Sequence, residues 1–186
     1  MVYTKDILAD SVKFGTMFLV AQYLVGGSLA DKAWQQSSLL TIVGFAIYQL
    51  FARDLVGIPP TGSGSSTQDM VINDIAKNGV MLVASRLLAG GSLTDMGWIK
   101  TAIGLLVGFV VYDILVAKYV QGHDLSSHAG IAASIDDAAK FGIMFVVQQL
   151  VTGGALSDKK WAMASLASLI GFSAYNLGTS RIVDAL

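Results

Sequence analysis

The chain has 186 residues, of which 54% are hydrophobic and only 13% are charged, against roughly 25% charged residues in typical soluble domains. This composition, with a mean hydropathy of +0.63, favours a bilayer as the surrounding solvent. The formal net charge of -1 argues against nucleic acid as a partner. The absence of cysteine excludes disulfides, thiolate metal sites and cysteine nucleophiles.

The first two predicted helices form a hairpin at the start of the chain. The first covers residues 6–25 and ends at Gly26 and Gly27, a pair suited to the left-handed conformation at a helix C-terminus. The second covers residues 29–52, and Ser28 with Asp31 predicts its N-terminal cap. Because both segments are apolar and close to 20 residues long, each is expected to cross a membrane. The charge pattern at the N-terminus does not fit a cleavable signal peptide, so the first helix is expected to be retained.

The same hairpin pattern occurs three times along the chain. Each copy contains D-x2-K-x-G-x-M, then a double glycine with L-x-D-x2-W, then GF-x2-Y. The further helices are predicted at 70–89, 93–118, 135–152 and 156–178. In the third copy Ala155 replaces the capping serine, so Ser157 or Asp158 is expected to cap the last helix.

The predicted fold is therefore an all-α membrane protein, with six transmembrane helices in three tandem helical-hairpin repeats of pseudo-threefold character. The whole chain is expected to form a single membrane domain, with repeats at 6–56, 69–120 and 134–186 joined by linkers at 57–68 and 121–133. Two helices per repeat place the hairpin turns on one face and both termini on the other. Lys and Arg are more frequent on the terminal face, which predicts that this face is cytoplasmic.

Two sets of repeated residues are assigned to contacts with lipid and between helices. Trp34, Trp98 and Trp161 lie near the start of the second helix of each repeat and are predicted to anchor it at the membrane interface. A substrate-stacking role for the three indoles is the alternative. Small residues at helical spacing in the second helices are predicted to let backbones approach closely. The helix-packing glycines are Gly44, Gly104, Gly108 and Gly171.

Charged residues inside the predicted spans are the candidates for a function other than packing. Arg86 stands where the other copies have Gln22 and Gln149, so these three residues form a candidate intramembrane polar ring. The simpler interpretation is that Arg86 reaches the interface or pairs with Asp95 in the same turn. Asp113 takes the place of two amides in the other copies, and Lys77 is its predicted partner.

Three Asp-x-x-Lys pairs lie one helical turn apart in the first helix of each repeat. They are predicted to neutralise each other within their own helix, unless the three pairs converge on a central axis. The pairs are Asp10 with Lys13, Asp74 with Lys77, and Asp137 with Lys140.

The residues give no support for an enzyme or a cofactor site. No phosphate-binding glycine loop, dinucleotide motif, zinc-protease motif or nucleophile elbow occurs. His123 and His128 with Asp124 are interpreted as solvated loop residues and not as metal ligands. We therefore predict a protein without catalytic activity, cofactor, metal or small-molecule substrate.

The chain resembles the small multispanning inner-membrane and minor capsid proteins of large icosahedral DNA viruses, such as the chlorella viruses. The resemblance rests on a hydrophobic chain free of cysteine and glutamate, and on G-G-S-L-x-D-x2-W hairpins at Gly26 to Trp34 and Gly90 to Trp98. Mitochondrial carriers also use three two-helix repeats, but their Pro-x-Asp-x2-Lys signature is missing here. The viral resemblance implies a virion component in an internal membrane that contacts capsid proteins.

The function predicted from these observations is structural. The protein is expected to act by contacts with the lipid bilayer and with neighbouring structural proteins, with the two linkers as contact surfaces. The alternative is a small pseudo-threefold membrane channel or carrier built around Gln22, Arg86 and Gln149.

Overall fold

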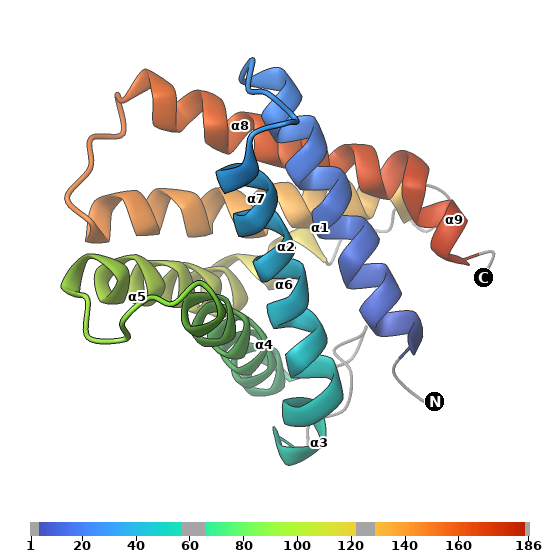
Figure 1. Cartoon of the computed structure of the whole chain (residues 1–186). Helices are drawn as coiled ribbons and strands as arrows, with labels where there is room; N and C mark the ends of the chain where they lie inside the picture. Colours follow the sequence, from blue (N-terminus) through green and yellow to red (C-terminus); the bar gives the residue numbers. More distant parts are fainter. Residues whose placement is uncertain (1–3, 57–65, 122–128, 185–186) are drawn as a thin grey trace.

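The computed structural model describes residues 4–56, 66–121 and 129–184, which form helices and turns with no strand among them (Figure 1). The predicted all-α class is thus confirmed. Six long helices are arranged as three pairs. In each pair a continuous first helix is followed by a second helix that contains one π-helical turn.

The helix bounds are as follows. The first pair consists of α1 (Thr4–Leu24) and the consecutive segments α2 (Lys32–Ile47), η1 (Tyr48–Ala52) and α3 (Arg53–Val56). The second consists of α4 (Thr67–Leu88) with α5 (Met96–Val111), η2 (Tyr112–Val116) and α6 (Ala117–Val120). The third consists of α7 (Ala129–Val151) with α8 (Lys159–Ala174), η4 (Tyr175–Thr179) and α9 (Ser180–Asp184).

The second helix of each pair begins three residues later than predicted at 29, 93 and 156. Asp31 is the N-cap of α2, and its carboxylate accepts hydrogen bonds from the backbone N–H groups of Ala33 and Trp34. Asp95 and Asp158 cap α5 and α8 in the same way. The serine was the wrong choice of cap because Ser28 accepts from the backbone of Ala30 within the turn, whereas the aspartate reaches two free donors of the helix. Asp158, one of the two predicted caps of the last helix, is confirmed.

The double glycines end the first helices as predicted. Gly26, Gly90 and Gly153 have φ angles of 73°, 71° and 79°, in the left-handed region that favours glycine. In each turn two backbone N–H groups bond back to the last carbonyls of the helix, as Gly27 does to Gln22 at 2.9 Å, which is the Schellman arrangement. At the start of the third pair the prediction differs from the structure, since α7 begins at Ala129 and not at residue 135.

The three pairs close into a ring, because the second helix of each pair packs against the first helix of the next. The most extensive helix contacts are those of α5 with α7, α1 with α8, and α2 with α4. The last of the three pairs therefore returns to the first, and Figure 1 shows α1 crossing in front of α8. Both described ends of the chain lie on the right of this view, opposite the turns of the second and third pairs.

The predicted packing glycines lie at these contacts between pairs. A Cβ atom added at Gly44 would come within 2.7 Å of the Met81 carbonyl oxygen, and one at Gly171 within 2.7 Å of Met17 Cα. At Gly108 the added atom would collide with the backbone of Met144. Gly104 also faces α7, where an added Cβ would lie 2.8 Å from the Cα of Gln148. Each glycine thus allows a direct approach between two helix backbones.

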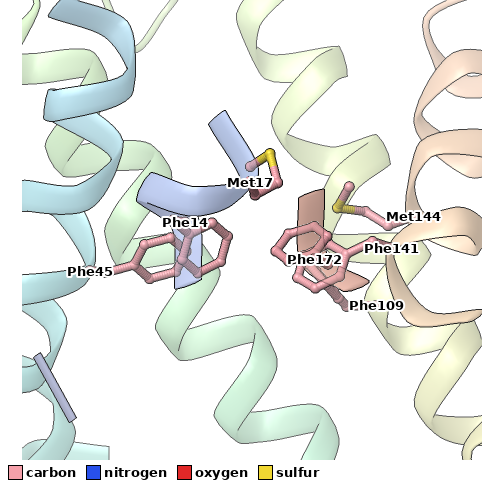
Figure 2. Close-up of a cluster of buried hydrophobic side chains, with 7 residues drawn as sticks. All are labelled: Phe14, Met17, Phe45, Phe109, Phe141, Met144 and Phe172. Carbon is pink, nitrogen blue, oxygen red and sulfur yellow. The ribbon is translucent and has the colours of Figure 1, made fainter. Parts of the chain in front are cut away.

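An aromatic layer fills the centre of the ring of helices. Phe14 stacks on Phe45 with ring centroids 4.1 Å apart, and Phe141 stacks on Phe172 at 4.0 Å. Edge-to-face contacts join the two stacks, and Phe109 contacts Phe141 at 5.7 Å. Figure 2 shows the two stacks side by side, with Met17 and Met144 on one side of the rings. We refer to the five phenylalanines as the aromatic layer.

The outer surface of the bundle is strongly apolar. Large hydrophobic side chains are exposed on all six long helices, with Leu39 60%, Phe51 69% and Leu166 59% exposed. Two helices, Lys32–Val56 and Met96–Val120, are long and apolar enough to cross a membrane.

Candidate functional site

Six charged residues form a ring at the centre of the bundle, directly beside the aromatic layer. Lys13 pairs with Asp137 at 2.7 Å, Lys77 pairs with Asp10 at 2.6 Å, and Lys140 pairs with Asp74. All three carboxylates are buried. We call this set the charged ring: Asp10, Lys13, Asp74, Lys77, Asp137 and Lys140.

The ion pairs join different helices, which corrects the prediction that each pair is neutralised within its own helix. Lys13 of α1 reaches α7, Lys77 of α4 reaches α1, and Lys140 of α7 reaches α4. Each lysine therefore contacts an aspartate of another first helix. The intrahelical prediction was wrong because the closure of three pairs into a ring brings all six groups together, the convergence that the sequence analysis named as the exception.

A second donor supports two of the three ring carboxylates. The side-chain amide of Gln49 donates to Asp10 at 2.8 Å, and that of Asn176 donates to Asp137 at 2.7 Å. Both amides are the second residue of a π-helical turn. A π-helical turn inserts an extra residue into the helix and is frequent at functional sites. Here each such turn brings an amide side chain to the charged ring.

The third π-helical turn carries a carboxylate at the corresponding position. Asp113 is the second residue of η2 and lies beside Asp74, with Lys140 and Asp136 as the next charges. The predicted partner Lys77 is wrong, because Lys77 is bound to Asp10 and the lysine next to Asp113 comes from α7. One of the three ring aspartates therefore has a carboxylate beside it, where the other two have an amide.

The lysines of the charged ring also lie over the aromatic layer. Lys13 Nζ is 5.6 Å from the ring centroid of Phe172, and Lys77 Nζ is 5.5 Å from that of Phe45. Lys140 occupies the same place over Phe109 at 5.7 Å. These distances allow cation–π attraction, so the aromatic layer and the charged ring form one continuous core.

Asn78 interrupts the aromatic layer. It is buried, takes the place in α4 that Phe14 and Phe141 take in their helices, and donates through its amide to the Asp74 carbonyl at 2.9 Å. A cavity of about 230 Å³, lined almost entirely by apolar residues, lies on one side of Asn78. A smaller one of about 90 Å³ on the other side is lined by all six residues of the charged ring.

The candidate polar ring of Gln22, Arg86 and Gln149 is held by the turns of the three hairpins. Gln22 donates to the Ser28 carbonyl at 3.0 Å, Arg86 to that of Ser92 at 3.1 Å, and Gln149 to that of Ala155 at 3.0 Å. The polar groups that meet at the centre are those of the charged ring, which stand 9 and 12 positions earlier in the same helices. The predicted ion pair of Arg86 with Asp95 is confirmed at 2.8 Å.

The three tryptophans lie in the first turn of the second helices and are partly buried. Their backbone N–H groups donate to the capping aspartates, as Trp98 does to Asp95 at 3.1 Å. The hydrogen bonds from Trp98 and Gly97 hold the pKa of Asp95 below its ordinary value of 3.8. Asp95 therefore stays ionised at the start of α5, where a negative charge favours the helix.

Several predicted features lie outside the described residues. His123, Asp124 and His128 belong to the segment 122–128, and most of the first predicted linker belongs to 57–65. Within the ranges 4–56, 66–121 and 129–184, no group of three or more side chains is arranged to hold a metal ion.

No protein-family model matches the chain, and neither curated proteins nor solved structures give a match.

The ring residues were predicted from the sequence as candidates, but their second donors and Asn78 were not. The signal for Gln49 and Asn176 was their alignment with Asp113 one residue after the repeated tyrosine. The signal for Asn78 was a polar residue where the other two copies have phenylalanine. Neither signal predicts a contact between helices until the order in which the helices pack is known.

Proposed function

We propose that this chain is an integral membrane protein whose six long helices cross the bilayer as three tandem hairpins around a pseudo-threefold axis. Its role is structural, exerted through contacts with lipid and with neighbouring proteins. The observation that carries the proposal is the distribution of side chains, with apolar residues outside and paired charges inside.

Exposure of the two helices that are long and apolar enough to span a membrane supports a lipid environment. In an apolar stretch of 18 residues within Lys32–Val56 only 22% of the residues are buried, and in the corresponding stretch of Met96–Val120 only 33% are buried. A core helix of a soluble protein would have most of such a window buried. Soluble proteins rarely expose large continuous apolar surfaces, whereas a bilayer solvates them.

The interior supports the same proposal, because charges within a membrane are expected to face the bundle centre and to pair. In the charged ring three lysines balance three aspartates, and the remaining carboxylate oxygens of Asp10 and Asp137 receive amide donors. The cyclic order of the ion pairs, and of the glycine contacts at Gly44, Gly108 and Gly171, supports a pseudo-threefold arrangement.

A structural role is favoured over transport by the packing of side chains at the centre. The stacked and edge-to-face phenylalanines occupy the axis next to the charged ring, and the ring charges are bound to one another. The outer surface, by contrast, offers apolar side chains to lipid and to partners on every helix. The resemblance to virion membrane proteins extends the proposal to a setting, an internal viral membrane beneath a capsid shell.

Cysteine accessibility in the membrane tests this proposal, and the cysteine-free chain makes single-cysteine variants unambiguous. Ala30→Cys, Thr94→Cys and Ser157→Cys place a thiol at the exposed turn of each hairpin, and Gln68→Cys places one at the opposite end. In oriented vesicles, a membrane-impermeant thiol reagent is expected to label the three turn positions from one side and position 68 only from the other.

Two outcomes contradict the proposal. Labelling of a turn cysteine from the same side as position 68 would exclude three parallel hairpins. Release of the wild-type chain from membranes by alkaline carbonate would exclude an integral protein. Leu39→Cys, on the outer face of α2, is the internal control and is expected to react only after detergent solubilisation.

A second function, a channel or carrier along the axis, is favoured by one observation. Of the five residues that line both central cavities, Asn78 alone is polar, the other four being phenylalanines of the aromatic layer. If the axis conducts, Asn78→Phe is expected to abolish ion flux into liposomes, whereas Arg86→Gln is expected to leave it unchanged. The structural proposal predicts no flux above that of empty liposomes for the wild type.

A further inference from the structure

The charged ring contains one position that is chemically different from the other two. Gln49, Asp113 and Asn176 are each the second residue of a π-helical turn. Gln49 and Asn176 each donate an amide N–H to a ring carboxylate. Asp113 lies beside the third ring carboxylate, Asp74, but an ionised carboxylate has no hydrogen to donate.

Asp113 is also almost completely shielded from water. It is 3% exposed, and neither of its carboxyl oxygens receives a hydrogen bond from the described residues. The charges that face it are Asp74 from α4, and Lys140 and Asp136 from α7. Asp136 is already engaged by the hydroxyl of Tyr112, and Lys140 by Asp74.

The charge balance of the core leaves no cation for an ionised Asp113. The three lysines of the charged ring are each paired with one ring aspartate. A fourth carboxylate at this place would be a buried, uncompensated negative charge next to Asp74, which is far more costly than a neutral carboxylic acid. One proton removes the repulsion and at the same time supplies the missing donor.

We propose that Asp74 and Asp113 form a proton-binding site that holds one proton between the two carboxyl groups. Asp113 accepts the proton from hydronium, which leaves as water, and the new O–H group donates a hydrogen bond to Asp74, in the place where Gln49 and Asn176 donate their amide N–H groups. Release of the proton breaks that O–H bond and leaves two adjacent carboxylates with a single lysine, Lys140. The ligand of this site is thus a proton, and the inference does not depend on the proposed structural role.

Infrared spectroscopy of the reconstituted full-length chain tests the proposal through the carbonyl stretch of a protonated carboxylic acid. At pH 5.5 the wild type is expected to show this band with an intensity of one carboxyl per chain and a shift in D₂O. Asp113→Asn, which places an amide donor beside Asp74, is expected to lose the band. Asp69→Asn, in the first turn of α4, is the matched control and is expected to keep it.

A transfer variant makes the test independent of how well Asp113→Asn folds. Asn176→Asp creates beside Asp137 the same carboxyl pair that Asp113 makes with Asp74, so the band is expected to double. Absence of the band from the wild type would overturn the proposal, as would its persistence in Asp113→Asn. An unchanged band in Asn176→Asp would also overturn it, because the paired geometry would then not suffice to hold a proton.

Discussion

Lys77 donates a hydrogen bond of 2.6 Å to Asp10, although the two residues are separated by 67 positions in the chain. The bond joins α4 to α1 across the centre of the bundle, and Gln49 holds the other oxygen of the same carboxylate at 2.8 Å. The closed ring of helices thus depends on charged contacts that no single hairpin can make. A hairpin folded alone would leave its Asp-x-x-Lys groups without these ion-pair partners.

Removing one member of this ion pair is expected to destabilise the bundle strongly. Lys77→Met leaves Asp10 buried without its cation, which costs about 3–5 kcal/mol in comparable buried pairs. Addition of Asp10→Asn removes the uncompensated charge and is expected to recover a large part of that loss. Chemical unfolding in detergent measures both values, with Lys32→Met at the exposed start of α2 as control. A loss in Lys77→Met no larger than in the control would contradict the role of the ring.

The close approach of helix backbones predicts that alanine substitutions at two helical glycines change the stability of the protein in opposite directions. Gly108→Ala would place a methyl group against the Met144 backbone, so a loss of about 1–3 kcal/mol is expected from overpacking. Gly79→Ala, in the interior of α4, would meet nothing within 4 Å and is expected to stabilise by about 0.5–1 kcal/mol. Thermal unfolding of the two variants distinguishes packing from helix propensity. Equal shifts in unfolding temperature would show that close packing at Gly108 does not contribute to stability.

Arg86 is expected to be replaceable by glutamine. Gln22 and Gln149 make the same hydrogen bond to their turns that Arg86 makes to the Ser92 carbonyl. Arg86→Gln therefore keeps this bond and loses only a partly exposed ion pair with Asp95, and such pairs contribute little to stability. Arg86→Leu loses both contacts and is expected to lower the unfolding temperature further. A large loss in the glutamine variant would assign Arg86 a role beyond its turn.

The cap of α5 predicts a pH dependence of stability at acid pH. Because backbone N–H groups hold the pKa of Asp95 below 3.8, its contribution is fully present above that pH and is lost as the pH falls through the lower folded value. Asp95→Asn keeps a capping oxygen that does not titrate. Between pH 6 and pH 2.5 the wild type is expected to lose more thermal stability than Asp95→Asn. Parallel losses in the two proteins would show that the cap does not contribute.

The helices and their ends were predictable because they depend on local chemistry. The double glycines end α1, α4 and α7 where a left-handed residue is required, and apolar runs of the right length define the helices between. The starts of α2, α5 and α8 were predicted too early because serine and aspartate can both cap a helix. Only the geometry of the turn decides that Asp31, and not Ser28, reaches the free N–H groups.

The charged ring could be predicted only in part. Composition and repetition identified Asp10 with Lys13 and their copies, but a pattern within one helix cannot reveal a partner on another. The partner is set by the order in which the hairpins close, and this order follows from contacts such as Gly171 with Met17. The same limit explains the wrong partner for Asp113, since Lys77 and Lys140 are equivalent in sequence and differ only in the helix that each one faces.

A cryo-EM map of the protein in its native membrane would show whether lipid surrounds a closed bundle of six helices. We expect acyl-chain density around all six helices, side-chain density for Leu39 and Leu166 in contact with it, and an axis closed by the aromatic layer. Neighbouring proteins are then expected at the ends of the bundle. A continuous solvated path past Asn78 and the charged ring would instead support transport, and an outer surface covered by protein with no bilayer would exclude an integral membrane protein.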